Sequence, residues 1–253
     1  EGAAIATIIA QAVSAALVMG KLLMTREIYR VRLGEICFDR KMIRRIVDIG
    51  LPAAIQQSIT SFSNVIVQSY INYFGTAAMA GYSATLRVDG FLQLPLQSFN
   101  MTITTFVGQN IGAKEYKRVK KGIFTSWLMC SGIILVGSVI MFLKAPSIIG
   151  IFTEDAAVIS VGSSMIRIFG SAYLFLPIIQ ILNGALRGAG RSKVPMYFML
   201  GCFVLLRQIY LMIAVPMTKN VSVVFAGWPV TWVVCAIGML VYYFKVDWLP
   251  KEE

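Results

Sequence analysis

The first residues that could do chemistry lie between positions 46 and 73, an apolar stretch unusually rich in amides and hydroxyls. Its polar side chains recur at steps of four, three, four and four residues: Gln57, Ser61, Asn64, Gln68 and Asn72. These steps place them on one face of a helix. Because unpaired amides are unfavourable in hydrocarbon, this face either hydrogen-bonds to neighbouring helices or forms one wall of a polar binding path.

A second polar face follows between positions 82 and 112, again with steps of three and four residues: Asp89, Gln93, Gln97, Asn100 and Thr104. Asp89 is the only carboxylate well inside an apolar block. Arg87 lies two residues away and points to another helical face, so it is not the obvious partner. Asp89 is therefore either a solvated residue near the outer interface or a group that binds a coupling cation or a substrate.

Other polar residues lie inside later apolar blocks. Gln180 and Asn183 follow Pro177, where amides can satisfy backbone groups freed by a helix break or line a cavity. Arg167 and Arg207 are also inside such blocks. We expect each arginine to find a carbonyl or carboxylate partner, either in a structural role or as a group that selects the charge of a substrate.

Signatures of enzymes and metal sites are missing from the sequence. It has no histidine, no GxxxxGK[ST] loop and no HExxH motif, and its four cysteines are far apart without CxxC spacing. We therefore expect no catalytic residue, no metal and no cofactor, and we expect that the protein is not an enzyme. Most of its Lys and Arg residues lie in short stretches between apolar blocks, which argues against nucleic acid as a partner.

The elements that carry these residues are long apolar segments. The 253-residue chain is 57% hydrophobic and 14% charged, whereas soluble domains are about a quarter charged. Blocks of about 20 apolar residues can cross a bilayer as helices. The sequence therefore predicts an all-α, polytopic transmembrane helical bundle of about seven helices. The expected segments are residues 3–24, 46–73, 82–112, 123–143, 158–186, 195–215 and 221–245.

Two prolines lie inside the longest of these segments. Pro95 and Pro177 each remove a backbone donor and crowd the preceding turn, so we expect kinks at both positions. A loop is expected to begin at Lys144, after the fourth segment.

The formal net charge of +11 is distributed with a clear polarity. Most Lys and Arg residues lie in the loops after the first, third and fifth segments and in the tail, whereas the opposite loops hold Lys144 and Lys219. Cytoplasmic loops carry the excess of Lys and Arg in membrane proteins. We therefore expect a multi-pass protein of the cell membrane, in contact with lipid, with a cytoplasmic C-terminus.

Four runs, in order along the chain, resemble the C-terminal half of multidrug and toxic compound extrusion (MATE) transporters. They are IGLPAAIQQ (49–57), TTFVGQNIGAKEYKRVKKG (104–122), IFTEDAAV (151–158) and LNGALRGAGRSKVPM (182–196). The resemblance implies one lobe of a twelve-helix, two-lobe fold. Residues 1–24 would then be a helix belonging to a missing N-terminal lobe, 25–45 a basic cytoplasmic linker, 46–246 the C-terminal six-helix lobe and 247–253 a cytoplasmic tail.

The same resemblance implies a secondary antiporter of the cell inner membrane. It would export drugs, other xenobiotics or toxic metabolites, as small cationic or amphipathic compounds, in exchange for Na⁺ or H⁺. The missing N-terminal lobe would be its partner. The residues expected to line the substrate cleft are Gln57, Ser61, Asn64, Gln68, Gln97, Asn100 and Asn183. Asp89 is the candidate for ion coupling.

This sequence departs from the family in its acids. Some members have a glutamate in the seventh helix and an aspartate in the tenth, but residues 56–62 and 173–183 contain no carboxylate. The chain thus resembles the branch whose coupling acid lies in the N-terminal lobe. Two alternatives remain open. One is a related flippase for lipid-linked oligosaccharides, which would need a strongly cationic cavity, and the other is a non-transporting membrane scaffold.

Overall fold

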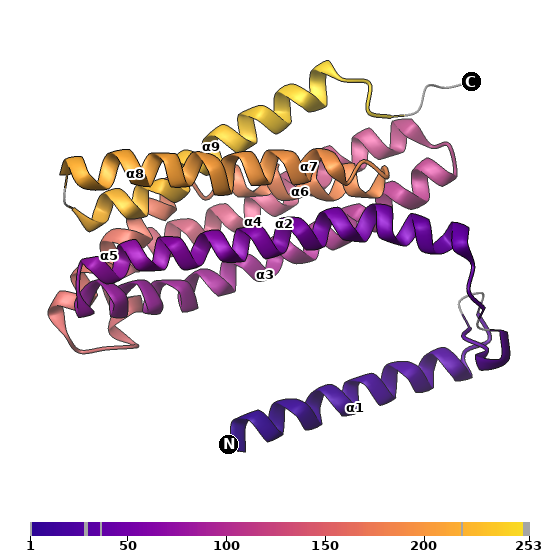
Figure 1. Ribbon diagram of the computed structural model, residues 1–253, viewed down its shortest axis with the longest axis horizontal. Helices are drawn as coiled ribbons and strands as arrows, with labels where there is room; N and C mark the ends of the chain where they lie inside the picture. Colours follow the sequence, from indigo (N-terminus) through magenta and orange to yellow (C-terminus); the bar gives the residue numbers. More distant parts are fainter. Residues whose placement is uncertain (1, 28–29, 36, 219, 250–253) are drawn as a thin grey trace. The chain divides into compact units, whose positions relative to one another are not determined.

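The computed structural model describes residues 2–27, 30–35, 37–218 and 220–249. Within these ranges the chain is helical and contains no strand, which confirms the predicted all-α class (Figure 1). The chain divides into two compact units, Glu1–Arg45 and Ile46–Glu253. Among the described residues, four helices are long and apolar enough to cross a membrane, or five if one bent pair counts as a single span.

The first unit consists of helix α1 (Gly2–Met24) and a segment that folds back on its end. The Thr25 N–H donates to the Lys21 carbonyl over 3.0 Å, and the Val31 N–H donates to the Leu22 carbonyl over 3.0 Å. Arg30 Nε donates to the Leu23 carbonyl over 3.1 Å. These bonds satisfy carbonyls that a helix end leaves without intrahelical partners. A short 3₁₀ turn, Leu33–Glu35, follows.

Helix α2 (Arg40–Tyr73) begins six residues before the expected apolar segment. The cause is a helix cap. Asp39 Oδ1 accepts from the backbone N–H of Lys41 over 2.8 Å and from that of Met42 over 3.3 Å. An aspartate in this position satisfies the free donors of the first turn and fixes where the helix starts.

Helix α3 (Thr76–Gly112) runs through Pro95 without a break, so the expected interruption there is not found. Helix α4 (Tyr116–Gly150) extends past Lys144, where a loop was expected to begin. Lys144 instead has a non-helical backbone (φ −106°, ψ 16°) two residues before Pro146. The proline crowds the preceding turn and lacks a donor, which accounts for a kink rather than a loop.

The fifth predicted segment is a broken helix. Helices α5 (Ala156–Gly170) and α6 (Phe175–Gly188) meet at a bend of 59°. Pro177 lies in the first turn of α6, where its missing donor costs little because those N–H groups lack intrahelical partners anyway. The break therefore precedes the proline by a few residues.

The last two predicted segments are also helical. Helix α7 (Lys193–Met199), a π-helical turn (Leu200–Leu206) and helix α8 (Arg207–Thr218) follow one another without a gap. Helix α9 (Val221–Lys245) is capped by Asn220, whose Oδ1 accepts from the Ser222 N–H over 2.9 Å.

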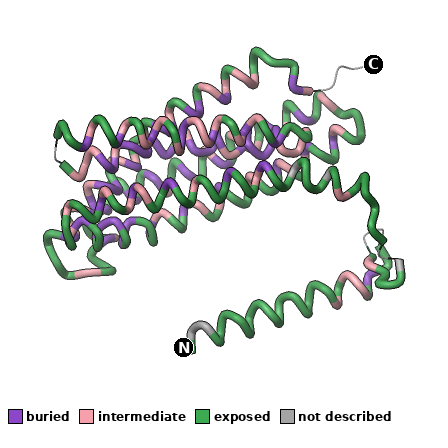
Figure 2. The backbone as a smooth tube through the Cα atoms, in the orientation of Figure 1, coloured by how far each residue is buried: buried purple, intermediate pink, exposed green. Residues whose placement is uncertain are grey.

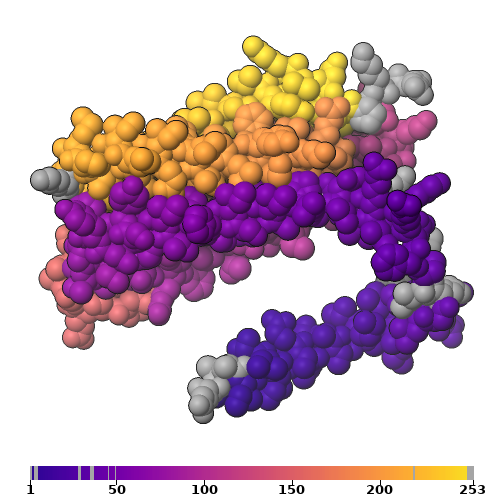
Figure 3. Space-filling view, in the orientation of Figure 1, coloured from indigo at the N-terminus to yellow at the C-terminus, as the bar shows by residue number. Residues whose placement is uncertain are grey.

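Helix α3 is central to the second unit, because it packs against α4, α5 and α6. Helix α9 packs against α5, α6 and α8. The buried residues lie mainly on the facing sides of these helices (Figure 2). On one face of this unit α2 and α7–α8 lie side by side (Figure 3).

Helices α3 and α6 approach closely because two glycines face α3. A side-chain carbon added at Gly184 would lie 2.6 Å from the Asn100 carbonyl oxygen, and one at Gly188 would collide with the Thr104 carbonyl oxygen. The two glycines are four residues apart on one helix, a spacing that lets helices in membranes pack backbone to backbone. This contact holds the helix after the break against the centre of the unit.

We therefore predict that Gly188→Ala lowers stability by about 1–3 kcal/mol, the usual cost of forcing extra atoms into a packed contact. Gly132→Ala is the matched control, because an added carbon there meets nothing within 4 Å. Thermal unfolding in detergent measures both variants. Equal midpoints for the two would contradict the close contact.

Candidate functional site

One side of α2 is bonded to the rest of the second unit through side chains. Gln208 Nε2 donates to Ser63 Oγ over 2.9 Å, and Ser63 Oγ donates to the Phe203 carbonyl over 3.2 Å. About two turns earlier on α2, Gln56 Oε1 accepts a hydrogen bond from Arg187 Nη2 over 3.0 Å. Gln56 and Ser63 are both buried. Polar contacts between helices thus hold α2 against α6 and α8.

Arg207, at the start of α8, is the most enclosed charge of this region, with 3% of its surface exposed. Its Nη1 donates to Asn64 Oδ1 over 3.1 Å and its Nη2 to Thr231 Oγ1 over 3.4 Å. Its Cζ lies 5.0 Å from the ring centre of Trp228 and 5.4 Å from that of Phe203. Such rings stabilise a desolvated cation. Among the described residues no carboxylate pairs with it.

Asp89 lies in the interior of the same unit, in the middle of α3. Its Oδ1 accepts from the Tyr173 hydroxyl over 2.6 Å, and its Oδ2 accepts from Gln93 Nε2 over 3.2 Å. Tyr173 is fully buried and belongs to the break between α5 and α6. This half-buried carboxylate is therefore hydrogen-bonded to the residue at the bend.

A row of aromatic rings connects these two charges. The Tyr173 ring stacks on Trp232 with centroids 5.6 Å apart, and Trp232 lies 5.2 Å from Phe169. Phe169 lies 5.3 Å from Trp228, the ring under Arg207. Rings in contact exclude water from the space between the acid and the cation, which strengthens the electrostatic influence of each on its surroundings.

Of the two amides that follow the helix break, Gln180 is bonded to α3. Asn100 Nδ2 donates to the Gln180 carbonyl over 2.7 Å and to its Oε1 over 3.3 Å. Asn183 is only 2% exposed, and its Oδ1 has no hydrogen-bond partner within the described ranges. An unpaired buried acceptor is unfavourable by about 1–3 kcal/mol. The Asn183 Oδ1 atom can therefore accept a hydrogen bond from a ligand, from water or, if the side chains rearrange, from another residue.

The remaining candidates lie on the outside of the second unit. Gln57 and Ser61 are exposed on α2, and Gln97 is exposed on α3. Gln68 donates from its Nε2 to Asn72 Oδ1 over 2.8 Å along the same helix. The structure thus brings Asn64 to Arg207 and Asn100 to the α6 region, while Gln57, Ser61 and Gln97 present amides and a hydroxyl to the exterior. Their role as a cleft wall stays a prediction.

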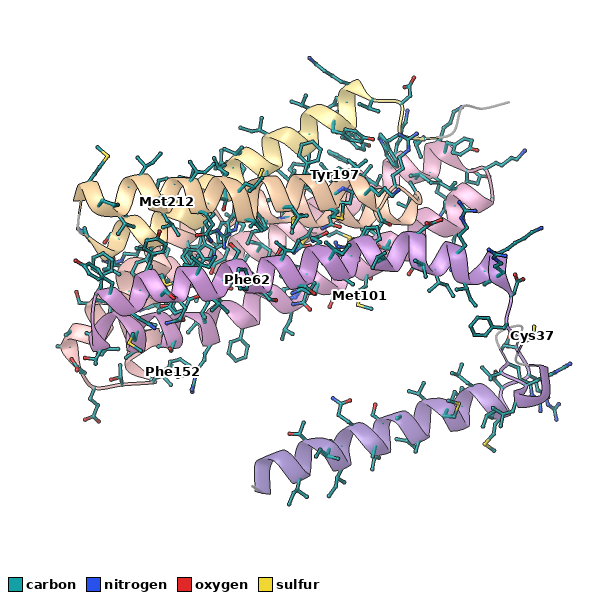
Figure 4. All side chains as sticks on the ribbon, in the orientation of Figure 1. Cys37, Phe62, Met101, Phe152, Tyr197 and Met212 are labelled. Carbon is teal, nitrogen blue, oxygen red and sulfur yellow. The ribbon has the colours of Figure 1, made fainter. Side chains whose placement is uncertain are left out.

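The outside of α2 and α3 continues this polar surface with scattered apolar side chains. Met101 is 72% exposed, and its side chain points away from the bundle, as that of Met212 does on α8 (Figure 4). A surface of amides interrupted by methionine can accommodate ligands of different shapes, because methionine is flexible and polarisable.

One expectation about charged residues is wrong. Arg167 has no carbonyl or carboxylate partner among the described residues and is exposed on α5, because its position falls on the outer face of that helix. Asp89 lies about four turns after the start of α3 at Thr76 and is half-buried beside Tyr173, and its role in binding a cation or a substrate stays a prediction.

Sequence reasoning missed the bonded side of α2. The buried residues Pro52, Gln56, Ser63 and Val67 recur at steps of four, seven and four, a second helical face rotated from the one that begins at Gln57. The spacing of that face could be recognised in the sequence. Its partners could not, because Arg187 lies 131 residues after Gln56 and Gln208 lies 145 residues after Ser63. No feature of the sequence around Tyr173 indicated its hydrogen bond to Asp89.

Comparisons with known proteins agree on one family. Residues 52–213 match the sequence model of the MatE family. The chain is 29% identical over 196 residues to the probable multidrug resistance protein NorM of Thermotoga maritima, covering 78% of this chain and 42% of that protein. It is 21% identical over 193 residues to the multidrug export protein MepA of Staphylococcus aureus, covering 76% of this chain and 42% of that protein.

The fold has counterparts among solved structures. A MATE crystal structure in a straight conformation superposes with a TM-score of 0.87 at 18% identity, covering 95% of this chain and 55% of that one. The Vibrio cholerae transporter VcmN in a bent form gives a TM-score of 0.83 at 20% identity, covering 96% and 55%. The chain spans about half the length of the proteins that it matches.

The Tyr173–Asp89 bond yields a stability prediction. Tyr173→Phe removes the donor to a buried carboxylate, and we expect a loss of about 1–3 kcal/mol. Tyr197→Phe is the control, because Tyr197 is exposed and has no hydrogen bond within the described ranges. In a thermodynamic cycle with Asp89→Ala, which leaves no acceptor for the Tyr173 hydroxyl, the double variant should lose less than the sum of the single variants. Additive losses would show that the bond contributes nothing of its own.

Proposed function

The chain belongs to the MatE family of transporters, and from this premise we propose that it forms one lobe of a secondary active antiporter. The whole protein would export drugs, other xenobiotics or toxic metabolites across the cytoplasmic membrane in exchange for Na⁺ or H⁺. The multidrug names of relatives such as MepA support the substrate class. The half-length coverage of those relatives supports a partner lobe that completes the transporter.

The exterior amide surface of α2 and α3 is the observation that carries this proposal. Gln57 and Ser61 are exposed on α2, and Gln97 is exposed on α3. Amides and hydroxyls facing hydrocarbon would lose hydrogen bonds to water without compensation. A cleft wall facing the partner lobe provides them with water or substrate instead. Cationic or amphipathic compounds can bind such a surface through amide oxygens and the exposed Met101.

Transport follows from two states of the whole protein, one open to each side of the membrane. Substrate and coupling ion shift the balance only if each binds the two states with different affinity. The basic loop between α3 and α4 and the basic turn after α6 support a cytoplasmic position for those ends and for the C-terminus.

Asp89 is the ion-coupling residue that we propose within this lobe. A proton or Na⁺ on its carboxylate would compete with the Tyr173 hydroxyl, which bonds to the same group. Tyr173 lies at the 59° bend, so losing that bond would release a constraint on the angle between α5 and α6. Ion binding at one acid is thereby linked to the shape of the helix pair.

The interior arginine argues against the flippase alternative. A site for a lipid-linked pyrophosphate would present accessible cations to the ligand. Arg207 is enclosed by Trp228 and Phe203 and already bonded to Asn64. It therefore serves the interior of the lobe rather than an open cavity.

Thiol labelling tests the cleft wall. With exposed Cys37 replaced by serine, cysteines introduced at Gln57, Ser61 and Gln97 of the full-length transporter in membranes should react with a charged, water-soluble maleimide. Val136→Cys is the control, because Val136 is 61% exposed on an apolar side of α4 and should face lipid. Labelling at Val136 but at none of the three amide-surface positions would exclude the proposed wall.

Ion exchange tests Asp89. Asp89→Asn keeps an oxygen that can accept from Tyr173, so the fold should persist, but it removes the charge and the titrating group. We expect drug-driven Na⁺ or H⁺ exchange in proteoliposomes to fall to background, while Asp155→Asn, at the exposed cap of α5, leaves exchange intact. Normal exchange by Asp89→Asn would place the coupling acid elsewhere.

A further inference from the structure

A cavity lies between the last turns of α3 and the first turns of α4. It has a volume of about 320 Å³ and is lined by Thr102, Phe106, Arg118, Lys121, Thr125 and Ser126. A groove of about 470 Å³ shares Thr102 and Phe106 with it and continues past Met101 toward Gln109. Of the residues assigned to the proposed substrate surface, Met101 lines the adjoining groove, whereas Gln57, Ser61 and Gln97 line neither the cavity nor the groove.

The cavity has two cations and no acid. Within the described ranges, neither Arg118 nor Lys121 has a carboxylate within ion-pair distance. The one contact of the Arg118 guanidinium is with the Phe106 ring, whose centre lies 5.9 Å from Cζ. No carboxylate lines the cavity. Two exposed positive charges without an acid partner, at the rim of one open pocket, favour an anion in that pocket.

Hydroxyl groups complete the lining. Thr102 Oγ1 donates to the Ser98 carbonyl over 2.8 Å, so its hydroxyl proton is already used in a hydrogen bond within α3. Thr125 and Ser126 have no hydrogen-bond partner among the described residues, and their hydroxyls can donate to a ligand. Phosphate oxygens accept from arginine, lysine and hydroxyl donors together, which is the set that this cavity offers.

The absence of a side chain at Gly122 shapes the cavity. A carbon added there would collide with the Phe106 ring. Glycine therefore lets that ring lie directly against the backbone of α4, where it forms a wall of the cavity and contacts Arg118. The ring and the guanidinium hold one another in place.

The depth of the cavity matches the headgroup layer of a bilayer. Helices α3 and α4 have 37 and 35 residues, about 56 and 53 Å, whereas a bilayer with headgroups is about 40–45 Å thick. Their ends must therefore pass through a headgroup layer. Phe106 lies six residues before the end of α3, about 9 Å inside it.

An apolar strip leads from the cavity toward the middle of α4. Phe124, Leu128, Met129, Leu135 and Val136 are all exposed, and they continue the helical face that begins with Lys121 and Thr125. Acyl chains can lie along such a strip while the headgroup occupies the cavity. A free phosphate ion would make no use of it.

We propose that this cavity binds the phosphate headgroup of an anionic diacyl phospholipid, with the acyl chains along the exposed face of α4. Basic pockets between membrane helices on the cytoplasmic side bind such headgroups. The proposal concerns a site separate from the substrate cleft and does not depend on which ion drives transport.

Lipid binding to the full-length protein in detergent tests the site. Fluorescent phosphatidylglycerol should bind and be displaced by unlabelled phosphatidylglycerol, but not by phosphatidylcholine or inorganic phosphate at the same concentration. Arg118→Gln with Lys121→Gln should weaken binding at least about tenfold. Lys117→Gln with Lys120→Gln removes the same charge from the same helix without touching the cavity lining, and should change binding no more than about twofold because exposed charges are screened by salt.

Three results would overturn the proposal. Equal weakening by both pairs of substitutions would mean general attraction to basic residues. Displacement by inorganic phosphate as effective as by lipid would make the ligand a free anion. If the arginine and lysine variant unfolds, Thr125→Val with Ser126→Ala keeps the charges and removes the free donors. That variant should bind about fivefold more weakly, and unchanged binding would reject the site.

Discussion

The hydrogen bond between the Tyr173 hydroxyl and Asp89 is the interaction on which the interior of this lobe depends. A carboxylate inside a helical bundle needs partners, because no water is available to solvate it. Here the partner comes from the short break between α5 and α6. The acid is therefore bonded to the point where that helix pair bends, and the Tyr173 ring there stacks on Trp232 of α9, the next ring in the row that ends at Arg207.

The same constraint explains how α2 is attached. Its attachment includes hydrogen bonds from amides, hydroxyls and guanidinium groups, beside the buried apolar side chains of Val67 and Ile71. By contrast, α3 and α6 are held together by backbone approach at Gly184 and Gly188. The lobe thus combines one tightly packed centre with one helix joined by exchangeable hydrogen bonds. A helix joined in that way can change partners at low cost, which would suit the cleft wall proposed above.

The helical class and the approximate segments were predictable, because blocks of about 20 apolar residues have few other stable outcomes. The period of three and four residues also indicated that α2 and α3 have polar faces. The hydrogen-bond partners of these polar residues on other helices were not predictable. Arg187 and Gln208 reach α2 from more than 130 residues away, and Tyr173 looks like any aromatic residue in an apolar run. The early start of α2 depended on the cap at Asp39, a local signal that hydrophobicity alone does not reveal. The break before Pro177 shows that a proline indicates the neighbourhood of a bend rather than its residue.

The polar content of α2 and α3 has a consequence for how the chain enters the membrane during its synthesis. Neither helix is among those apolar enough to count as a span by hydropathy within the described residues, whereas α4, α7–α8 and α9 are. The side chains that hydrogen-bond to α2 are synthesised later, since Arg187, Arg207 and Gln208 follow their bonded partners on α2 by more than 130 residues. Helix α2 therefore cannot reach its final free energy in lipid when it leaves the ribosome. It must wait at the translocon or beside a neighbouring helix until the end of the lobe arrives, so that integration into the bilayer and tertiary folding become a single late event.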